Sequence, residues 1–563
     1  MRIFLSEPFL VLLGLNLIAA VGMNLVYITG QLNLGQAGFL AVGAYVGAVT
    51  DVVLGWGLAP SVAAGAVAAA SVALPVAFGA SRVRGIYLIM GTLAVGEVVQ
   101  VAFGNIDAVG GLQGYSGMSP VGLRGVYAIL ALMIAASVGL MSSHAGLQMR
   151  SLFDDEDAAA AAGVPTRRIK IASVVISAAV VGVSGALVAK WFLFIAPRNF
   201  GIDLSFRIAL FTLLGGVHSL LGAVAGAVGV TGLLEALARI RELPFGESLA
   251  PLARWRLAVY GGLVIVLMAT LPEGIVGRRL ALRLTAPARR LRRTFARPGR
   301  FSRGRGTDEP VEPGRTVLAI EDVSHRFGGL QALDGVTMEV AAGETVALVG
   351  ANGAGKTTLV NVVAGRFPCQ AGRVSLLAED VTRTPAFRRT RRGICRTFQD
   401  VRVFAHLTVE ETLRLGHAAG GQRVRPSIDD LVRLLGLEGK RDRLPGSLSL
   451  AERRRLEIGR ALAAGPLVLF LDEPSAGMNE QERRELGDLI RSIASSGTAV
   501  VLVDHNLDLA FGVAERVVAL DFGRVIAAGD PDSVLEDPRF REAYLGAEDR
   551  SFTVHRDDNV VEP

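Results

Sequence analysis

Residues 345–358 read TVALVGANGAGKTT, and this stretch decides the fold of the second half of the chain. Its first five residues indicate a short buried strand, and an apolar helix is expected over 359–364. Between them lies the pattern GxxxxGK[ST]. In this pattern the loop amides surround phosphate oxygens, the lysine reaches the β- and γ-phosphates, and the next hydroxyl can bind Mg²⁺. The sequence therefore predicts a nucleotide-phosphate site in a strand–loop–helix unit. The residues of this site are Gly350, Asn352, Gly353, Ala354, Gly355, Lys356, Thr357 and Thr358.

A second apolar strand, over 467–471, ends in a pair of acids, Asp472 and Glu473. Phosphoryl transfer needs one acidic group in the shell of Mg²⁺ and one that polarises the attacking water. We expect Asp472 to take the first role and Glu473 the second. Together with the alternation of strands and helices over 315–546, these acids predict an α/β domain that hydrolyses a nucleotide.

The first half of the chain is a succession of apolar runs. Each is close to the roughly 20 residues that a helix needs to cross about 30 Å of hydrocarbon. Cytoplasmic loops of membrane proteins keep Lys and Arg, so the basic residues within 82–84, 150–170 and from Arg278 onward are expected inside. The sequence thus predicts an α-helical polytopic membrane domain over 1–273. The predicted spans are 8–28, 33–54, 58–80, 86–106, 122–141, 171–195, 204–237 and 254–271.

The run 204–237 has 34 residues, which is too long for one simple span. It must add either no crossing or two, because the basic groups on both sides of it are expected inside. Gly215, Gly216 and Gly222 indicate a break, so we predict a re-entrant or broken helix pair whose open backbone is buried in protein. The number of spans places the N-terminus outside, whereas Arg2 favours the inside, and the sequence leaves this point open.

The composition is unusual for a soluble enzyme, with 51% hydrophobic and 20% charged residues among 563 and a formal charge of +6. Residues 1–273 carry 15 Lys and Arg against 13 Asp and Glu (+2), 274–314 carry 11 against 3 (+8), and 315–563 carry 32 against 36 (−4). The surplus therefore lies in a basic linker after the last span, where it fits membrane orientation and contact with anionic lipid. We expect no nucleic-acid partner.

Two cysteines, Cys369 and Cys395, are too few for a disulfide framework and fit a reducing compartment.

The loop 142–170 is the longest one expected on the cytoplasmic side. A short helix is predicted over 154–162, because acids in a first turn oppose the helix dipole and Gly163 with Pro165 ends the helix. We expect this helix to contact the α/β domain, and a solvated connection is the alternative. Its acids are Asp154, Asp155, Glu156 and Asp157.

Ionisable residues within predicted spans are candidates for function because they are costly in a membrane. We expect most of them to line helix interfaces, and a role in the transport pathway for Glu97 is the alternative. They are Glu97, Lys190, Arg207, His218 and Glu235.

Two further segments and one aromatic residue complete a resemblance to ABC-transporter ATPases over 315–546. The segment RTFQDVRVF places Gln399 where that family senses Mg²⁺ and contacts the membrane domain, and VLVDHN places His505 where the family contacts the γ-phosphate. Phe327, in HRFGGLQAL, stands where the family stacks an aromatic ring on adenine. The resemblance implies an ATPase that uses ATP and Mg²⁺. It implies catalytic roles for Glu473, His505 and Gln399 and metal binding by Thr357, Gln399 and Asp472.

The family's signature segment departs from its usual form. Where the family has Leu-Ser-Gly-Gly-Gln, residues 448–452 read LSLAE. In the family this segment caps the ATP bound by the opposite subunit, and a glycine that needs positive φ or close approach would be impaired by the methyl group of Ala451. We hypothesise one slowed or asymmetric ATP site in the assembled transporter, and no gain of ATPase activity in A451G would remove this hypothesis. The signature residues are Ser449, Leu450, Ala451 and Glu452.

Both halves resemble branched-chain amino acid (LIV-type) importers. LDEPSAGMN (471–479) is similar to one of their two ATPases, and NLGQAGFLAVGAY (33–45), RGIYLIMGTLAVGE (84–97) and FTLLGGVHSLLGAVAGA (211–227) resemble their larger permease. The resemblance implies a fused permease–ATPase subunit in the bacterial cytoplasmic membrane, with the ATPase in the cytoplasm and 154–163 as its coupling helix.

The resemblance also implies partners, because ABC ATP sites form between two ATPases and this chain supplies one. LIV-type systems use a second permease, a second ATPase and an external solute-binding protein, and the second half of this transporter can be separate or also fused. A homodimer is favoured less, because both sites would then carry the altered signature. Importers of urea, short amides or other small carboxylate-bearing solutes share the architecture and are the alternative. The tail 547–563 is predicted to be disordered.

Overall fold

The structure is a computed structural model that describes residues 6–238, 256–271, 274–276, 312–420 and 425–544. The chain forms two compact units. The first contains Met1–Phe153 and Thr166–Arg300, and the second contains Asp154–Pro165 and Phe301–Pro563. The predicted basic linker 274–314 and the tail 547–563 lie almost wholly outside the described residues.

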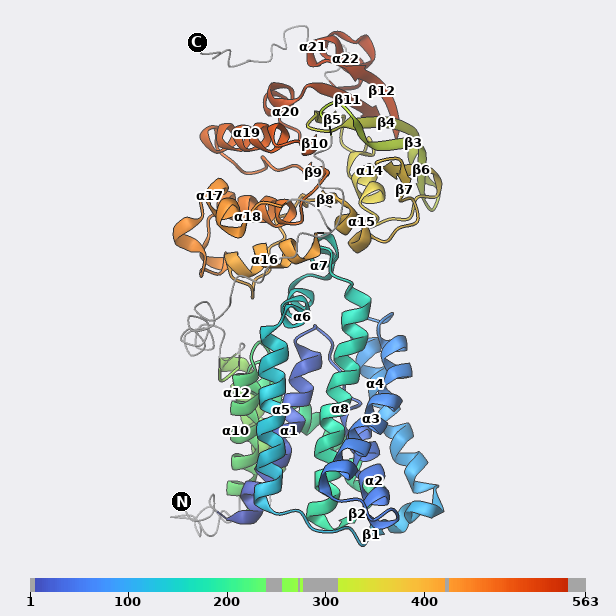
Figure 1. Cartoon of the computed structure of the whole chain (residues 1–563), viewed down its shortest axis with the longest axis vertical. Coiled ribbons are helices and arrows are strands. Elements are labelled where there is room, and N and C mark those ends of the chain that lie inside the picture. The colour runs from blue at the N-terminus through green and yellow to red at the C-terminus, as the bar shows by residue number, and fades with distance from the viewer. Residues whose placement is uncertain (1–5, 239–255, 272–273, 277–311, 421–424, 545–563) are drawn as a thin grey trace. The chain divides into compact units, whose positions relative to one another are not determined.

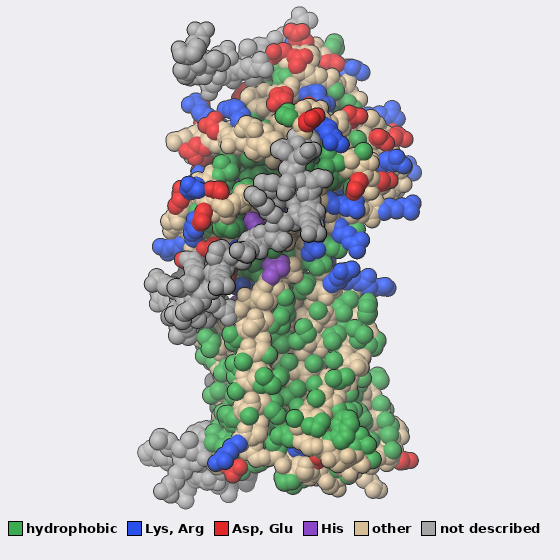
Figure 2. Space-filling view, in the orientation of Figure 1, with side chains coloured by type: hydrophobic (Ala, Val, Ile, Leu, Met, Phe, Trp, Pro, Cys, Tyr) green, Lys and Arg blue, Asp and Glu red, His purple; other side chains and the backbone are tan. Residues whose placement is uncertain are grey.

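The first unit is helical, and its long helices run side by side (Figure 1). Six of its described helices are long and apolar enough to cross a membrane, and apolar side chains cover the face of this unit in Figure 2. A polytopic membrane domain is confirmed in this form. The six are α1 (Glu7–Tyr27), α3 (Leu58–Ala80), α4 (Ile86–Gly104), α5 (Leu123–Ser142), α8 (Thr166–Phe192) and α10 (Leu220–Ala238). Shorter helices are α2 (Gln36–Val52), α6 (His144–Asp154), α9 (Ile202–Gly215) and α12 (Arg256–Thr270).

Small residues bring the central helices of this unit into backbone contact. A Cβ added to Gly43 of α2 would lie 2.2 Å from the carbonyl oxygen of Gly182 of α8. One added to Gly185 would lie 2.0 Å from the carbonyl oxygen of Leu40. Helices in lipid associate through such close packing of small residues. This packing explains much of the glycine in the first half of the chain.

The long run 204–237 is a broken helix pair, as its glycines predict. α9 ends at Gly215, Gly216 has φ 115°, and α10 begins at Leu220. The two helices touch at their glycines, because a Cβ on Gly215 would lie 1.8 Å from the carbonyl oxygen of Gly222. The backbone of the break is therefore packed against protein, which is the condition for irregular structure inside a membrane.

The two ends of the helical unit differ in charge. Arg167 Nε donates to Ser81 Oγ at 3.2 Å, so the basic loop after α3 and the start of α8 lie at one end. At the opposite end, Val121 N donates to the carbonyl oxygen of Lys190 at 3.2 Å. Tyr127, near the start of α5, donates its hydroxyl to the carbonyl oxygen of Leu10 at 3.1 Å. The start of α1 therefore lies at the end of the unit opposite the basic loop.

Lys190 lies at a helix interface, where it pairs with Asp51. Its Nζ is 2.5 Å from Asp51 Oδ1, and the two side chains are 1% and 5% exposed. Ser119 Oγ donates to Asp51 Oδ1 at 2.8 Å and accepts from Lys190 Nζ at 3.1 Å. The pair joins the last turns of α2 and α8 to the segment before α5. Glu97, in contrast, is exposed on the surface of this unit rather than buried in its interior.

The second unit has the predicted α/β fold. Its main sheet has the order β12-β11-β5-β10-β9-β8, with β12 alone antiparallel. These strands are β5 (Thr345–Val349), β8 (Ile394–Arg396), β9 (Val468–Asp472), β10 (Ala499–Val503), β11 (Arg516–Asp521) and β12 (Arg524–Gly529). A second, antiparallel sheet has the order β4-β3-β6-β7, with bounds Thr316–Phe327 for β3, Leu330–Ala341 for β4, Ala371–Leu376 for β6 and Glu379–Asp380 for β7.

Helices surround these sheets. Strands β5, β9 and β10 are buried along their whole length, which accounts for their apolar sequences. The helices are α7 (Glu156–Ala161), α14 (Lys356–Val363), α15 (Ala386–Arg392), α16 (Val409–Ala419), α17 (Ile428–Leu434), α18 (Leu450–Ala463), α19 (Glu480–Ser495), α20 (Leu507–Val513), α21 (Pro531–Glu536) and α22 (Pro538–Tyr544).

Candidate functional site

The phosphate loop follows β5 and leads into α14. Three of its glycines have positive φ, 150° at Gly350, 85° at Gly353 and 105° at Gly355, which other residues adopt with strain. Lys356 is 6% exposed, and its Nζ donates to the carbonyl oxygens of Gly350 at 2.6 Å and Ala351 at 3.0 Å. Burial lowers the pKa of Lys356, although Glu473 and Asp472 oppose this effect. The Lys356 side chain therefore folds back over the loop, where its charge would be balanced by the phosphate oxygens of a bound nucleotide.

The two acids lie at the carboxyl end of β9. Because β5, β10 and β9 are neighbouring parallel strands, their carboxyl ends share one edge of the sheet. Asp472 N donates to Thr397 Oγ1 at 3.2 Å, and the next residue, Glu473, has φ 46° and donates its N–H to the carbonyl oxygen of Val503 at 2.7 Å. The geometry brings both acids beside the phosphate loop, as the spacing of the motifs predicts.

His505 reaches Glu473 from the segment after β10. His505 Nε2 lies 2.9 Å from Glu473 Oε1, and these side chains are 43% and 16% exposed. An imidazole so placed can hold the carboxylate and face a phosphate at the same time. This contact gives a physical basis to the paired roles expected of the two residues.

The acidic group of Asp472 suits Mg²⁺. Its Oδ1 is buried and has no hydrogen-bond partner among the described residues. Burial, with a further contribution from Glu473, raises the pKa of Asp472 to about 6, so a nearby cation would be needed to keep it fully ionised. Mg²⁺ is bound by one or two carboxylates together with phosphates and water, so a single carboxylate is sufficient. Thr357 is exposed at the start of α14 and Gln399 is exposed after β8, where both can add oxygen ligands.

Phe327 ends β3 in an aromatic cluster. The side chain is 44% exposed, and its ring centroid lies 4.6 Å from that of His325 and 5.3 Å from that of Phe367, both edge to face. Phe367 lies shortly after α14, so the cluster is near the far end of the phosphate-loop helix. An exposed ring held in this way can stack on a nucleotide base.

The signature segment forms the start of α18. Ser449 is the N-cap, its Oγ accepts from Glu452 N at 3.2 Å, and the Glu452 carboxylate accepts from Ser449 N at 3.0 Å. Glu452 also pairs with Lys440. Ser449 and Leu450 are exposed, whereas Ala451 is 7% exposed and packs in the core. The idea that position 451 needs positive φ is wrong, because Ala451 is in the first helical turn of α18.

The predicted short helix of the 142–170 loop is present as α7 and belongs to the second unit. Asp155 is its N-cap, with Oδ1 accepting from Ala158 N at 2.8 Å, and Gly163 with φ 76° follows its end. Asp155 Oδ2 lies 3.1 Å from Arg402 Nη1. Asp157 Oδ2 lies 2.8 Å from Arg366 Nη2.

Further bonds fix this segment at both ends. Asp154 accepts from His406 N at 2.9 Å and pairs with the His406 ring. Thr390 Oγ1 donates to the carbonyl oxygen of Ala161 at 3.2 Å, and Arg391 Nε donates to that of Gly163 at 3.1 Å. These bonds confirm that α7 contacts the α/β domain, and they exclude a merely solvated connection.

Sequence reasoning did not single out the basic partners of α7. Arg402 is in the quoted segment RTFQDVRVF, three residues after Gln399, and Thr390 and Arg391 belong to the arginine-rich stretch RRTRR (388–392). The acids of α7 pair with the isolated arginines Arg402 and Arg366, whereas Thr390 and Arg391 of the run bond to backbone carbonyl oxygens. Which arginine meets which acid depends on the fold.

A buried ionic cluster, also missed, joins α18 to the Gln399 segment. Glu457 is fully buried between Arg454 and Arg460, with N–O distances of 3.6 Å to each. Arg454 donates to the carbonyl oxygens of Phe398 at 2.7 Å and of Gln399 at 2.8 Å. The cluster therefore connects the signature helix to the stretch that bears Gln399.

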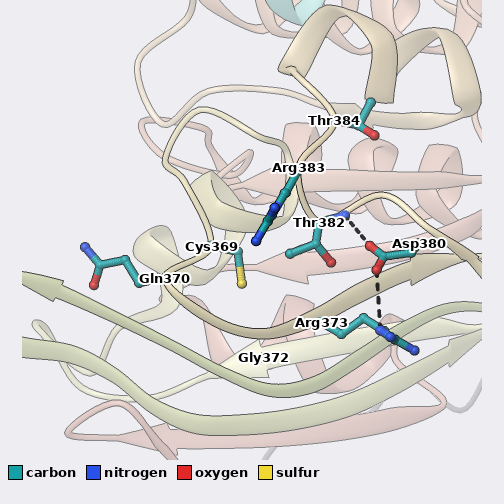
Figure 3. Close-up of a pocket in the computed structure, with 8 residues that line it drawn as sticks. All are labelled: Cys369, Gln370, Gly372, Arg373, Asp380, Thr382, Arg383 and Thr384. Carbon is teal, nitrogen blue, oxygen red and sulfur yellow. Dashed lines mark hydrogen bonds and ion pairs between the residues drawn. The ribbon is translucent and has the colours of Figure 1, made fainter.

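A cavity of about 510 Å³ lies elsewhere in this unit (Figure 3). It is lined by Cys369, Gln370, Gly372, Arg373, Asp380, Thr382, Arg383 and Thr384. Its walls are polar, and Figure 3 shows Asp380 held by Arg373 and Thr382. None of the expected ATP-site residues lines it. We therefore locate the nucleotide site from the phosphate loop and the acids rather than from this cavity.

Two family models match the chain. One is described as the permease component of a branched-chain amino acid transport system and matches residues 7–268. The other is described as ABC transporter and matches residues 333–476. The two matches fall on the two halves that the sequence separates.

Known proteins resemble the second half. The high-affinity branched-chain amino acid transport ATP-binding protein LivG of Salmonella typhimurium is 33% identical over 249 residues, which are 41% of this chain and 98% of LivG. BraF of Pseudomonas aeruginosa, of the same description, is 32% identical over 251 residues, with the same coverage. The lipopolysaccharide export system ATP-binding protein LptB of Haemophilus influenzae is 33% identical over 235 residues, again covering 41% of this chain and 98% of LptB. Among solved structures, the ADP conformation of MJ1267, an ATP-binding cassette of an ABC transporter, is 29% identical, with 41% and 99% coverage and a TM-score of 0.38.

Proposed function

Because this chain belongs to the branched-chain amino acid ABC transporters and joins their permease domain to their ATP-binding domain, we propose that it is one fused half of an importer. This half would use ATP hydrolysis to move branched-chain amino acids across the bacterial cytoplasmic membrane. The observation that carries the proposal is the position of α7. This helix lies in the chain between two membrane helices, and its acids pair with Arg402 and Arg366 of the ATP-binding unit. Movement within the ATPase can therefore act directly on the permease.

In the ATPase we assign phosphate binding to the loop from Gly350 to Thr358, with Lys356 on the β- and γ-phosphates. Asp472, Thr357 and Gln399 would hold Mg²⁺, which supplies positive charge at the phosphates when bound. Glu473 would polarise the attacking water, with His505 holding its carboxylate 2.9 Å away. Phe327 would stack on adenine. Each role follows from the motif and is supported by the position of the side chain.

Hydrolysis reaches the membrane domain through a short chain of contacts. Gln399 is on the segment that Arg454 holds from α18, and Arg402 of the same segment pairs with Asp155 of α7. A change at the γ-phosphate that moves Gln399 would therefore move Arg402 and α7. This sequence of contacts supports coupling by α7 and by its acids Asp154, Asp155, Glu156 and Asp157.

The exposed signature residues favour a composite ATP site. Ser449 and Leu450 are accessible on this unit, as are Asn352 and Gly353 of the phosphate loop. We infer that a second ATPase completes the site, carried by a second permease–ATPase half that differs from this one, with a homodimer as the less favoured assembly. An external solute-binding protein would deliver the substrate.

The test is uptake by the assembled transporter in proteoliposomes. The full chain would be purified with its co-encoded subunits and given labelled leucine, isoleucine, valine or urea, together with the solute-binding protein. We expect uptake of at least one branched-chain amino acid that requires internal ATP and is lost in E473Q. Uptake of urea or an amide with no uptake of these amino acids would instead support the alternative importer.

A further inference from the structure

The chain between α1 and α2 is irregular yet deeply buried. α1 ends at Tyr27 and α2 begins at Gln36, and in between Gln31 and Asn33 are 3% and 1% exposed. Inside a membrane, non-helical backbone is tolerated only where it is buried in protein or lines a water-filled pathway. This segment therefore lies in the interior of the helical unit.

Two helix N-termini meet at this depth. In the first turn of α2, Ala37 N donates at 3.2 Å to the Oγ of Ser205, which is in the first turn of α9. The residue before α9, Gly201, lies beside Gln100 of α4. One turn earlier in α4, Gly96 packs against Gly38 of α2, so α2 and α9 begin near the same part of α4. Each helix N-terminus carries a partial positive charge, so two together in an apolar setting favour an anion between or beside them. The only acid in these first turns, Asp203, has an exposed side chain.

Two amide side chains at the same place have unused hydrogen-bonding atoms. Asn33 Nδ2 and Gln36 Oε1 have no partner among the described residues, although the side chains are buried. Their other amide atoms are engaged, because Asn33 Oδ1 accepts from Gly35 N at 2.8 Å and Gln36 Nε2 donates to Ser177 Oγ at 3.2 Å. Buried polar atoms are nearly always partnered, so an unused donor and an unused acceptor three residues apart in one buried segment point to a ligand.

We propose that Asn33, Gln36 and the joined N-termini of α2 and α9 bind the zwitterionic end of an α-amino acid on its way through the permease. The carboxylate would take a hydrogen bond from Asn33 Nδ2 and lie near the positive ends of the two helices, and the ammonium would donate to Gln36 Oε1. The other described side chains that bond to this region are hydroxyls, those of Thr92, Ser177 and Ser205. A neutral lining suits a ligand whose two charges cancel. This proposal rests on the import function proposed above and names the group that is recognised.

An aromatic cluster lies between this point and the end of α2 that carries Asp51. Further along α2, the ring of Tyr45 stacks on Phe103 at a centroid distance of 4.2 Å, and Phe200 lies against it at 6.1 Å. These rings stand between the amides and the buried ion pair. A ligand that enters from that end must separate them, so the proposed site is reached only when the permease opens.

The sharpest test is Asn33→Asp. This change keeps the Oδ1 that accepts from Gly35 and replaces only the unused Nδ2 by an oxygen. The matched control is Asn16→Asp on α1, where Nδ2 already bonds to Thr231 Oγ1 at 3.0 Å and the hydroxyl can donate to the new carboxylate. Binding of labelled leucine would be measured on the full chain with its co-encoded subunits in nanodiscs, without the solute-binding protein. Leucinamide, which lacks the carboxylate, would be the competitor.

We expect N33D to weaken leucine binding at least tenfold and to shift preference toward leucinamide, and N16D to stay within twofold of wild type. Leucine binding by folded N33D equal to wild type overturns the proposal. If N33D does not fold, Gln36→Glu is the test variant. A carboxylate beside the ammonium group should raise the affinity for leucinamide about tenfold. An unchanged affinity for leucinamide in Q36E overturns the proposal. If wild type takes up leucine in an ATP-dependent way but N33D binds leucine unaltered, the binding-site proposal is wrong and the import function stands. Failure of wild type to take up any branched-chain amino acid removes the proposed function itself.

Discussion

Glu473 has a backbone conformation that few residues other than glycine adopt. With φ 46° it is held by the bond from its N–H to Val503 and by the His505 ring. A non-glycine residue in the left-handed region is typically strained by about 1–2 kcal/mol, and such strain is found at functional sites. We infer that the turn after β9 is kept in order to aim this carboxylate at the phosphate edge of the sheet.

The first prediction concerns that carboxylate. Glu473→Gln keeps the size of the side chain and removes its charge, so it should lower ATP hydrolysis about 100-fold or more while ATP still binds. Phosphate release and nucleotide binding by the assembled transporter measure the two effects. Glu485→Gln, on the exposed face of α19, is the control and should hydrolyse ATP like wild type. E473Q with more than half of the wild-type rate would show that another group polarises the water.

The second prediction concerns Ala451. Its backbone is helical and the residue packs in the core of its own unit, so the altered signature does not impose backbone strain. We therefore expect A451G to lower the free energy of unfolding by about 1 kcal/mol, the usual difference between Gly and Ala in a helix, with no rise in ATPase rate. Calorimetry and ATPase assays on the full chain measure both. A clear rise in rate would restore the hypothesis of a slowed ATP site.

At the scale of elements, one residue of the α7 segment, Asp155, has two stabilising roles, as a helix cap and as an ion-pair partner. Asp155 caps the helix and also pairs with Arg402. Loss of an N-cap costs about 1 kcal/mol, but loss of the pair should in addition separate the movement of α7 from that of the ATPase.

We therefore expect Asp155→Ala to lower transport at least fivefold more than it lowers ATP hydrolysis. The readout is the number of leucine molecules taken up per ATP hydrolysed in proteoliposomes. Asp530→Ala is a matched control, because Asp530 caps α21 by accepting from Ser533 N at 3.1 Å and bonds to no residue of α7 in the described structure. Equal losses of transport and hydrolysis in D155A would assign Asp155 a purely structural role.

The buried cluster of α18 predicts a pH effect. Burial raises the pKa of Glu457 from its ordinary 4.5 to about 7, more than Arg460 and Arg454 lower it. A carboxyl group whose pKa is higher in the folded chain binds more protons when folded, so this contribution to stability falls as pH rises from about 4.5 to about 7 and is level above that. Calorimetry of the full chain across pH 5–8 should show this fall, and Glu457→Gln should make it smaller, with the raised pKa of Asp472 leaving a remainder. The same pH slope in E457Q would contradict the assignment.

The elements show which parts of the fold a sequence can predict. The span predicted at 58–80 is α3 itself, and the break at Gly215–Gly216 was expected, because length, apolarity and glycine are local properties. The phosphate loop and its acids were likewise expected from their motifs. The pairing of Lys190 with Asp51, the burial of 28–35 and the arginines that meet α7 were not, because each depends on packing between segments that are far apart in the chain.

At the scale of the whole molecule, the chain contains every part of one ATP site except the signature that faces it. The exposed Ser449 and Leu450 need a second phosphate loop opposite them, and the exposed Asn352 and Gly353 need a second signature. This exposure supports the proposal that a second ATPase completes the site.

The last prediction follows from this incompleteness. The purified chain alone should hydrolyse ATP slowly, and addition of its co-encoded ATPase and permease subunits should raise the rate per chain at least tenfold. Phosphate release as a function of subunit ratio measures this, with a plateau expected at one to one. A rate that instead grows with the concentration of this chain alone would favour the homodimer.

α8 also has a mechanical meaning. It starts at Thr166, directly after the segment that belongs to the ATP-binding unit, and runs for 27 residues, about 40 Å, to the turn that bears Lys190. Its glycines allow direct backbone contact with α2, with no side chains between the two helices at these positions. We infer that a helix joined through the chain to α7 at one end and paired with Asp51 at the other would carry a movement of α7 along its axis. On this inference, a movement that begins at the nucleotide would reach the end of the helical unit that carries Lys190.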